Sequence, residues 1–159
     1  MTARTLAADE VTALVDELWL PFAREMAAAE PHDAPADESA AREQAVVYRR
    51  GRVADDEVVT YVVPAGDGGT FAAYAEAEVR ASPPVSERGA ECYLRGVYVR
   101  PGDRGRGLAD GLLDRVEAWG RERGCEHVTL DVHPGNDAAK ALYEGRGYEL
   151  LRAKLALAL

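Results

Sequence analysis

Apolar residues recur at helical spacing in four parts of this chain. The predicted helices run from Asp9 toward Ala29, from about Glu38 to Arg50, from Leu108 toward Gly124, and from about Asn136 through Tyr143. Pro21 lies within the first helix and can kink or divide it, because proline has no N–H to donate. The third helix places Leu108, Leu112, Val116 and Trp119 on one face, which indicates that this face is buried.

Segments rich in β-branched and aromatic residues alternate with these helices. Strands are predicted at Thr2–Leu6, Glu57–Val63, Thr70–Arg80, Cys92–Val99, His127–Val132 and, as a final strand or strand pair, Tyr148–Leu159. The turn Gly66–Gly69 joins the second and third strands into a hairpin. In the last segment, apolar residues alternate from Leu151 to Leu159. This order of elements predicts one α/β domain, residues 1–159, in which helices cover a mixed sheet.

The segment Arg100–Ala109 joins a predicted strand to a predicted helix. It contains three arginines and three glycines, Arg100, Arg104, Arg106, Gly102, Gly105 and Gly107. Glycines let bare backbone N–H groups approach a bulky anion, and the N-terminus of the following helix adds partial positive charge. The segment is therefore predicted to bind a phosphate group.

Two motifs in the second half of the chain resemble the GCN5-related N-acetyltransferase (GNAT) family. The run Arg104-Gly-Arg-Gly107-Leu-Ala109 matches the Arg-x-x-Gly-x-Ala loop that holds the diphosphate of acyl-CoA in that family. The run from Asn136 to Tyr148 is similar to the family's Asn-x(6)-Tyr-x-x-x-Gly-[Phe/Tyr] segment. The resemblance covers Cys92 to the C-terminus, and before residue 90 only the order of elements agrees.

The resemblance implies an acyl-CoA N-acyltransferase fold with a mostly antiparallel central sheet. Its one parallel pair, here the strands around Leu94–Val99 and His127–Asp131, is expected to splay apart and admit the pantetheine arm of the coenzyme. The residues expected to bind acetyl-CoA are Val97, Tyr98, Val99, Arg104, Gly105, Arg106, Gly107, Leu108, Ala109, Asn136 and Tyr143. The implied reaction moves an acetyl group directly from acetyl-CoA to a primary amine of a small molecule or peptide, without a metal.

Tyr143 is the expected general acid, because a phenol with a pKa of about 10 stays protonated at neutral pH and can donate to a thiolate. Asn136 stands two helical turns earlier, so both side chains can address one ligand, and Asn136 can also cap the helix. Glu91 is the candidate general base, acting through a water, with Tyr93 as an alternative on the same strand face. Two further carboxylates, Glu76 and Glu78, lie on the preceding predicted strand.

Composition narrows the class of protein. The chain has 159 residues, is 47% hydrophobic and carries a net charge of −9, which predicts a globular domain and disfavours a nucleic-acid partner. No apolar run is long enough to span a membrane and no secretory signal is seen, so a cytoplasmic location is expected. Cys92 and Cys125 lack the spacing of a zinc site. An acidic chain with only two lysines is typical of salt-adapted proteins or of a GC-rich genome, and similar proteins are commonly homodimers.

The sequence leaves two alternative functions open. A catalytically silent acyl-CoA-binding or regulatory domain would share the loop and lack a base. A dinucleotide oxidoreductase is suggested by Gly105-x-Gly107-x-x-x-Gly111, followed by Asp131 at a strand end. This second alternative is disfavoured because four residues separate the strand from Gly105, whereas dinucleotide folds place the first glycine directly after the strand.

Overall fold

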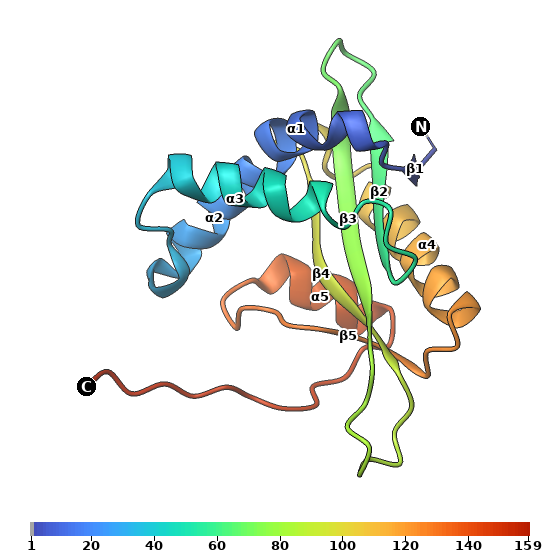
Figure 1. Ribbon diagram of the computed structural model, residues 1–159. Helices are drawn as coiled ribbons and strands as arrows, with labels where there is room; N and C mark the ends of the chain where they lie inside the picture. Colours follow the sequence, from blue (N-terminus) through green and yellow to red (C-terminus); the bar gives the residue numbers. More distant parts are fainter. Residues whose placement is uncertain (1) are drawn as a thin grey trace.

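The computed structural model, which describes residues 2–159, is built on a five-stranded mixed sheet with helices on both faces (Figure 1). In spatial order the strands are β1 (Arg4–Thr5), β2 (Val58–Pro64), β3 (Phe71–Arg80), β4 (Glu91–Val99) and β5 (His127–Leu130). Neighbours from β1 to β4 pair antiparallel, and β4 pairs with β5 in parallel. The predicted mixed sheet with a single parallel pair is confirmed.

The helices and short helical turns agree closely with the apolar periodicity. They are η1 (Ala8–Glu10), α1 (Val11–Leu14), η2 (Val15–Trp19), α2 (Leu20–Ala29), η3 (Pro31–Asp33), α3 (Glu38–Arg50), η4 (Pro101–Asp103), α4 (Leu108–Glu122) and α5 (Asp137–Gly145). Pro21 does not end the first helix. The turn before it, η2, widens to a π-helix, because Pro21 donates no hydrogen bond and its ring crowds the carbonyl four residues earlier.

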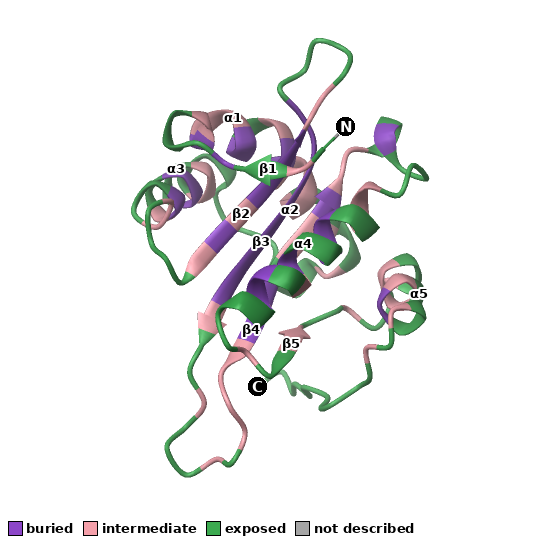
Figure 2. Cartoon of the chain, turned by 90° about the vertical axis from the view of Figure 1, so that its right-hand side faces the viewer, coloured by how far each residue is buried: buried purple, intermediate pink, exposed green. Residues whose placement is uncertain are grey.

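Two apolar clusters hold the helices on the sheet. On one face, α4 contributes Leu112, Leu113, Val116 and Trp119, and α5 contributes Tyr143. On the other face, residues of α1, η2 and α3 pack over β2 and β3. The central strand β3 is buried along most of its length (Figure 2). Within residues 2–159, no helix is both long and apolar enough to cross a membrane, and no group of three or more His, Cys, Asp or Glu residues is placed to hold a metal ion.

A buried ionic cluster ties α3 to the sheet. The Glu76 carboxylate on β3 is only 2% exposed and lies 2.9 Å from Arg49 Nε and 3.3 Å from Arg95 Nε. Glu78 pairs with Arg52 and Arg95 in the same region. Each carboxylate is thus held by two or more guanidinium groups, which explains how the sheet tolerates buried charge.

The contact between α4 and β4 depends on Gly120. A Cβ atom at this position would lie 3.0 Å from Cys92 Cβ, closer than packed carbons normally approach. We expect Gly120→Val to lower the free energy of unfolding by about 1–3 kcal/mol through overpacking. Gly111→Val is the matched control, because Gly111 lies on the same helix and an added Cβ meets nothing within 4 Å. Urea denaturation of both variants checks this, and equal losses of stability would contradict it.

Two sequence predictions are corrected. Residues 148–159 form no strand, although a final strand or strand pair was predicted there. The alternation of apolar residues is present, but no neighbouring strand pairs with this segment, and a strand requires a partner for its hydrogen bonds. The predicted strand His127–Val132 also ends earlier, at Leu130, because β4 turns away from it there.

Candidate active site

A cleft opens where β4 and β5 separate. The parallel pairing runs from Glu91 and His127 to Leu94 and Leu130 and stops there. Beyond this point a cleft of about 490 Å³ is lined by the end of β4, the loop before α4, the segment after β5 and one face of α5. Its size is within the range of small-molecule sites, and it lies at the carboxyl ends of two parallel strands.

A β-bulge in β4 sets which backbone groups face the cleft. The pairing with β3 shifts register after Gly96, which pairs with Glu76, so Arg95 is the extra residue. Arg100 N–H donates to Ala72 O on β3. Because backbone groups alternate sides along a strand, the N–H and C=O groups of Val97 and Val99 point away from β3 into the cleft. Tyr98 directs its backbone toward β3.

The loop before α4 presents a row of free backbone donors. Within residues 2–159, no acceptor takes a hydrogen bond from the N–H groups of residues 105–110. Gly107, the residue that precedes α4, and Gly105 both have φ of +74°, a left-handed conformation that glycine adopts without strain. These free N–H groups at the positive end of a 15-residue helix form a site for an anion such as a diphosphate.

The three arginines of this loop are less free than their sequence suggests. Asp103 is buried, with 6% exposure, and its two oxygens lie 2.7 Å from Arg100 Nη2 and 2.7 Å from Arg106 Nη1. Arg104 donates through Nη2 to both oxygens of Glu25, each at 2.9 Å, and through Nε to Val99 O. The carboxylates hold the loop in shape and offset part of its positive charge, so the backbone N–H groups are the donors of this loop that stay free for an anion.

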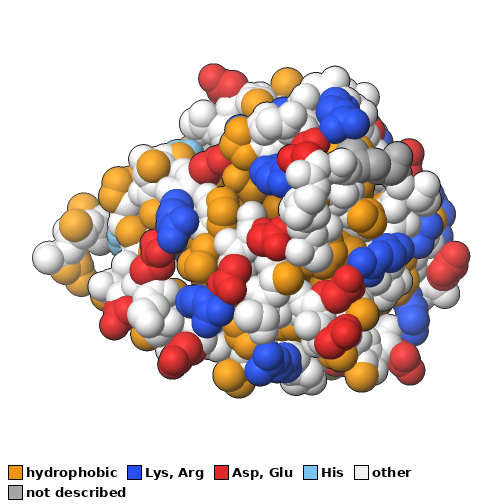
Figure 3. Space-filling model, turned by 90° about the horizontal axis from the view of Figure 1, so that it is seen from above, with side chains coloured by type: hydrophobic (Ala, Val, Ile, Leu, Met, Phe, Trp, Pro, Cys, Tyr) orange, Lys and Arg blue, Asp and Glu red, His pale blue; other side chains and the backbone are white. Residues whose placement is uncertain are grey.

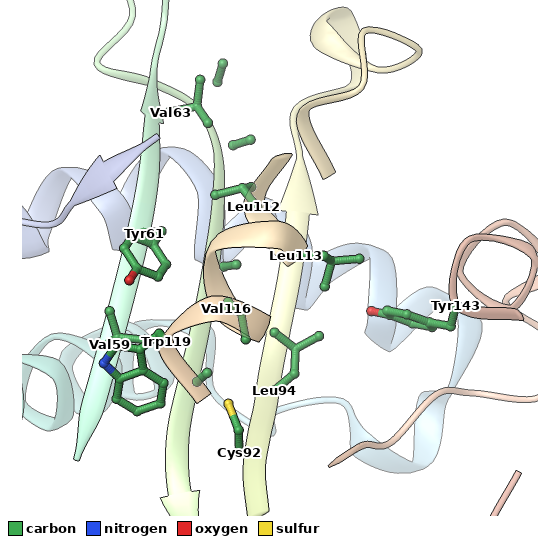
Figure 4. Packing of buried hydrophobic residues seen from close by; sticks show 14 residues of the cluster. Val59, Tyr61, Val63, Cys92, Leu94, Leu112, Leu113, Val116, Trp119 and Tyr143 are labelled. Carbon is green, nitrogen blue, oxygen red and sulfur yellow. The ribbon is translucent and has the colours of Figure 1, made fainter. Parts of the chain in front are cut away.

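Tyr143 projects from α5 toward β4, with its hydroxyl directed into the space beside Leu94 and Leu113 (Figure 4). Its ring is packed against Tyr148 with 5.5 Å between centroids. Burial raises the pKa of the Tyr143 hydroxyl to about 12, because the phenolate would lose its hydration. The hydroxyl forms no hydrogen bond within residues 2–159, so it is a donor available to a ligand.

Asn136 lines the same cleft and also caps α5. Asn136 immediately precedes the helix, and its side-chain oxygen accepts a hydrogen bond of 3.1 Å from Ala139 N–H. The amide NH₂ is not engaged by this bond and is available to a ligand. Asn136 and Tyr143 therefore stand two turns apart on the helix face that lines the cleft.

The sequence analysis did not predict an acidic residue of the cleft, Asp131. Asp131, the residue after β5, lines the cleft and accepts a 2.5 Å hydrogen bond from the Tyr93 hydroxyl. Burial and this hydrogen bond both raise the pKa of Tyr93. Sequence analysis gave Asp131 a role only in the disfavoured dinucleotide alternative. Its position directly after β5, at the end of a splayed strand, could have identified Asp131 as a residue of the cleft.

His133 joins two sides of the cleft. Its Nδ1 accepts from Gly135 N–H at 3.1 Å, and its Nε2 lies 2.7 Å from a carboxylate oxygen of Glu30, at the end of α2. Nδ1 is thus unprotonated and Nε2 carries the proton donated to Glu30. The hydrogen bond with His133 lowers the pKa of Glu30.

Glu91 occupies a different region from the other predicted site residues. It is the first residue of β4, opposite Arg80 and His127, and it does not line the cleft. With a rise of about 3.3 Å per residue, it stands roughly 20 Å along the strand from Val97. The remaining predicted residues, in β4, the loop and α5, are brought together around the cleft with the exception of Arg106, which points to Asp103.

Comparison with known proteins agrees with this geometry. The model of the family described as "Acetyltransferase (GNAT) family" matches residues 13–148. The chain belongs to the GNAT acetyltransferase family. The resemblance inferred from the two motifs is thereby confirmed, and it extends to the first half of the chain, where the sequence showed only an order of elements.

Curated relatives of this GNAT protein match it over less than half of its length. An aminoglycoside N(6')-acetyltransferase type 1 of Salmonella typhimurium is 33% identical over 57 residues, which is 36% of this chain and 39% of that protein. Acetyltransferase SG1711 of Sodalis glossinidius is 41% identical over 70 residues, or 44% of this chain and 47% of that protein. The chain thus matches less than half the length of these relatives.

Solved structures share the whole fold. A tetramutant of the BH1408 protein from Bacillus halodurans superposes with a TM-score of 0.86 at 16% identity, with 100% of both chains covered. A protein from Clostridium acetobutylicum described as a predicted acetyltransferase and solved with acetyl-CoA has a TM-score of 0.74 at 20% identity, covering 99% of this chain and 95% of that chain. At these identities the likeness establishes the fold of the GNAT domain.

Proposed function

We propose that this GNAT protein transfers an acetyl group from acetyl-CoA to a primary amine of a small molecule or peptide, with both substrates bound together. The observation that carries the proposal is the row of unpaired N–H groups at residues 105–110, which opens onto the same cleft as the Tyr143 hydroxyl. One end of this cleft suits a diphosphate, and the other holds a proton donor. An acyl-CoA thioester is a substrate that needs both.

Binding of acetyl-CoA would use the two sets of free backbone groups. The diphosphate accepts hydrogen bonds from the loop, where fixed N–H donors act in place of water. The amide groups of the pantetheine arm pair with the peptide groups of Val97 and with the N–H of Val99, as an added strand would, because the Val99 carbonyl already accepts from Arg104 Nε. The thioester carbonyl then lies beside the backbone N–H groups of β4, which polarise it. Holding the amine next to it removes most of the entropic cost of the encounter.

The chemical step needs two protons removed from the amine nitrogen and one supplied to sulfur. The amine arrives as an ammonium ion, loses one proton to a water held by Asp131, and attacks the thioester carbon with its lone pair. The nitrogen of the tetrahedral intermediate loses its second proton to the same water, the C–S bond breaks, and the thiolate of CoA takes the proton of Tyr143. The products are the acetylated amine and the free thiol of CoA. The Tyr143 phenolate regains a proton from solvent, and one proton is released to solvent overall.

Asp131 replaces Glu91 in this scheme because of its position. Asp131 lines the cleft at the carboxyl end of β5, and only one of its oxygens is engaged by Tyr93. Glu76 and Glu78 are occupied by arginines. A carboxylate with one free oxygen at the open side of the cleft can both attract an ammonium group and orient the water that deprotonates it.

We expect Asp131→Asn to raise KM for the amine about tenfold while leaving the Kd for acetyl-CoA unchanged, since the amide retains a polar contact but carries no charge. Steady-state kinetics with varied amine checks this expectation. Asp137→Asn is the matched control, because Asp137 is also an aspartate near the cleft but does not line it. Equal effects of the two substitutions would remove Asp131 from the acceptor site.

The acidic lining favours an acceptor with further positive charges. Asp131 lines the cleft with one oxygen that Tyr93 does not engage, Glu25 lines it while paired with Arg104, and Glu30 lies at its edge beside His133. Multiply charged amines, the class to which the aminoglycosides acetylated by the Salmonella relative belong, would suit these groups. The test is release of free CoA thiol from acetyl-CoA with a panel of aminoglycosides, polyamines and lysine peptides. Tight binding of acetyl-CoA without turnover on any amine would instead support a silent acyl-CoA-binding domain.

A further inference from the structure

Asp131 differs from the other acidic residues that line the cleft. Each of the other three forms an ion pair with an arginine: Glu25 with Arg104, Asp103 with Arg100 and Arg106, and Asp110 with Arg146. Arginine and acidic side chains also lie next to one another over the face shown in Figure 3. Within residues 2–159, Asp131 pairs with no cation, and its one side-chain partner is the hydroxyl of Tyr93, at 2.5 Å. The charge of Asp131 is therefore not offset.

Tyr93 reaches Asp131 at the point where β4 and β5 separate. The parallel pairing of the two strands ends at Leu94 and Leu130, so Asp131 is the first residue beyond it. Among the described residues, the Asp131 backbone makes no hydrogen bond. In the same part of the chain, the Tyr93 hydroxyl makes the only side-chain hydrogen bond that joins β4 to β5 or to the residues directly after it. The direction of the Asp131 carboxylate thus depends on this one bond.

The ring of Tyr93 is itself fixed by Arg80. The guanidinium carbon of Arg80 lies 3.4 Å from the centroid of the ring, and Arg80 Nη2 and Nε donate to Glu78 at 3.0 and 3.2 Å. Glu78 is buried and belongs to the ionic cluster that ties α3 to the sheet. A cation on the face of a tyrosine ring is attracted to it and restricts its orientation. Glu78 thereby keeps the Arg80 cation on the ring of Tyr93.

The Tyr93 hydroxyl holds the carboxylate as a neutral donor. Burial and the hydrogen bond with Asp131 raise the pKa of Tyr93, so its hydroxyl stays protonated at neutral pH. A guanidinium in the same place would also hold the carboxylate but would offset its charge. With Tyr93 as the donor, the second oxygen of Asp131 keeps its attraction for an ammonium group. Tyr93 does not line the cleft, so it acts on Asp131 and not on a substrate.

We propose that Tyr93 is a positioning residue for acetyl transfer, whose hydroxyl holds one oxygen of Asp131 and directs the other into the cleft toward the acceptor amine. The inference rests on the proposed function, in which Asp131 attracts the ammonium group and orients the water that deprotonates it. Tyr93 takes part as a hydrogen-bond donor and not as the general base, the role that the sequence left open for it. Its proton stays on the phenol throughout the reaction.

Tyr93→Phe is expected to lower kcat about tenfold and to leave KM for the amine within about twofold, because the charge of Asp131 remains while its direction is lost. The thermal midpoint and the Kd for acetyl-CoA are expected to stay at wild-type values, since the ring remains under Arg80. The readout is release of CoA thiol with the amine of highest kcat/KM among aminoglycosides, polyamines and lysine peptides. Tyr48→Phe is the matched control, because the Tyr48 hydroxyl accepts from Arg52 in the same ionic cluster but does not line the cleft.

A double-mutant cycle shows whether Tyr93 acts through Asp131. In an Asp131→Asn background, Tyr93→Phe is expected to change kcat/KM by less than twofold, because no charge remains to be directed. Wild-type kcat in Tyr93→Phe, or a tenfold loss that persists in the Asp131→Asn background, would overturn the inference and leave the proposed function in place. Wild-type kinetics in Asp131→Asn would remove the proposed role of Asp131, and a wild type that acetylates no amine of the panel would remove the proposed function. Either of these two results would also end the inference.

Discussion

Tyr143→Phe is expected to lower kcat by roughly 100-fold and to leave the Kd for acetyl-CoA within about twofold of the wild type. The substitution removes only a hydroxyl that has no partner within residues 2–159, so packing of the ring against Tyr148 is retained. Without this donor, the thiolate must leave unprotonated or take its proton from water. Thiol-release kinetics at saturating acetyl-CoA measures the change.

The pH dependence separates this role from a structural one. Because burial raises the pKa of Tyr143 to about 12, the wild-type hydroxyl stays protonated through neutral and mildly alkaline pH. We therefore expect no loss of kcat from ionisation of Tyr143 up to about pH 10. Tyr148→Phe is the matched control, because the Tyr148 ring packs against the Tyr143 ring but its hydroxyl donates to Glu117. A Tyr143→Phe enzyme with wild-type kcat would exclude Tyr143 from the proton path.

Gly107→Val is expected to weaken acetyl-CoA binding by roughly 100-fold, which corresponds to about 2.7 kcal/mol. Gly107 has φ of +74°, and a β-branched residue resists this conformation. The loop must therefore change shape, which moves the N–H groups of residues 105–110 out of alignment. The new side chain would also occupy space that the diphosphate needs to approach the backbone. Isothermal titration calorimetry measures the loss.

Gly124→Val is the control for strain alone. Gly124 follows α4 with the same φ of +74°, and neither glycine has an atom within 4 Å of an added Cβ. Both substitutions are expected to lower the free energy of unfolding by similar amounts, of about 1–2 kcal/mol. Only Gly107→Val is expected to change affinity for acetyl-CoA. If both weaken binding equally, the loop before α4 does not contact the coenzyme.

Much of the fold was predictable because the apolar pattern of each segment agrees with the face that the segment buries in the structure. The helix Glu38–Arg50 was predicted to its last residue, since Asp37 caps its start and its apolar residues face one side. The hairpin of β2 and β3 followed from two β-rich runs around a glycine turn. The C-terminal segment was predicted incorrectly, because alternation reveals the ability to form a strand but not the presence of a neighbour to pair with.

The site was predictable where short motifs encode backbone geometry. Gly105 and Gly107 signalled the left-handed turns that free the loop donors, and the spacing of Asn136 and Tyr143 predicted a shared helix face. Ion pairing of the loop arginines was not predictable, because Glu25 is 79 residues away from Arg104 in sequence. For the same reason, the approach of Asp131 to Tyr93 required the parallel pairing of β4 and β5 to be known.

Titration of the wild-type protein with acetyl-CoA in a calorimeter tests the account most directly, because every proposed step of the acetyl transfer begins with the coenzyme on the loop before α4. We expect one site per chain with a Kd in the micromolar range, an affinity that falls with added salt, and no heat from NADH. Absence of binding to acetyl-CoA at both low and high ionic strength would contradict the account.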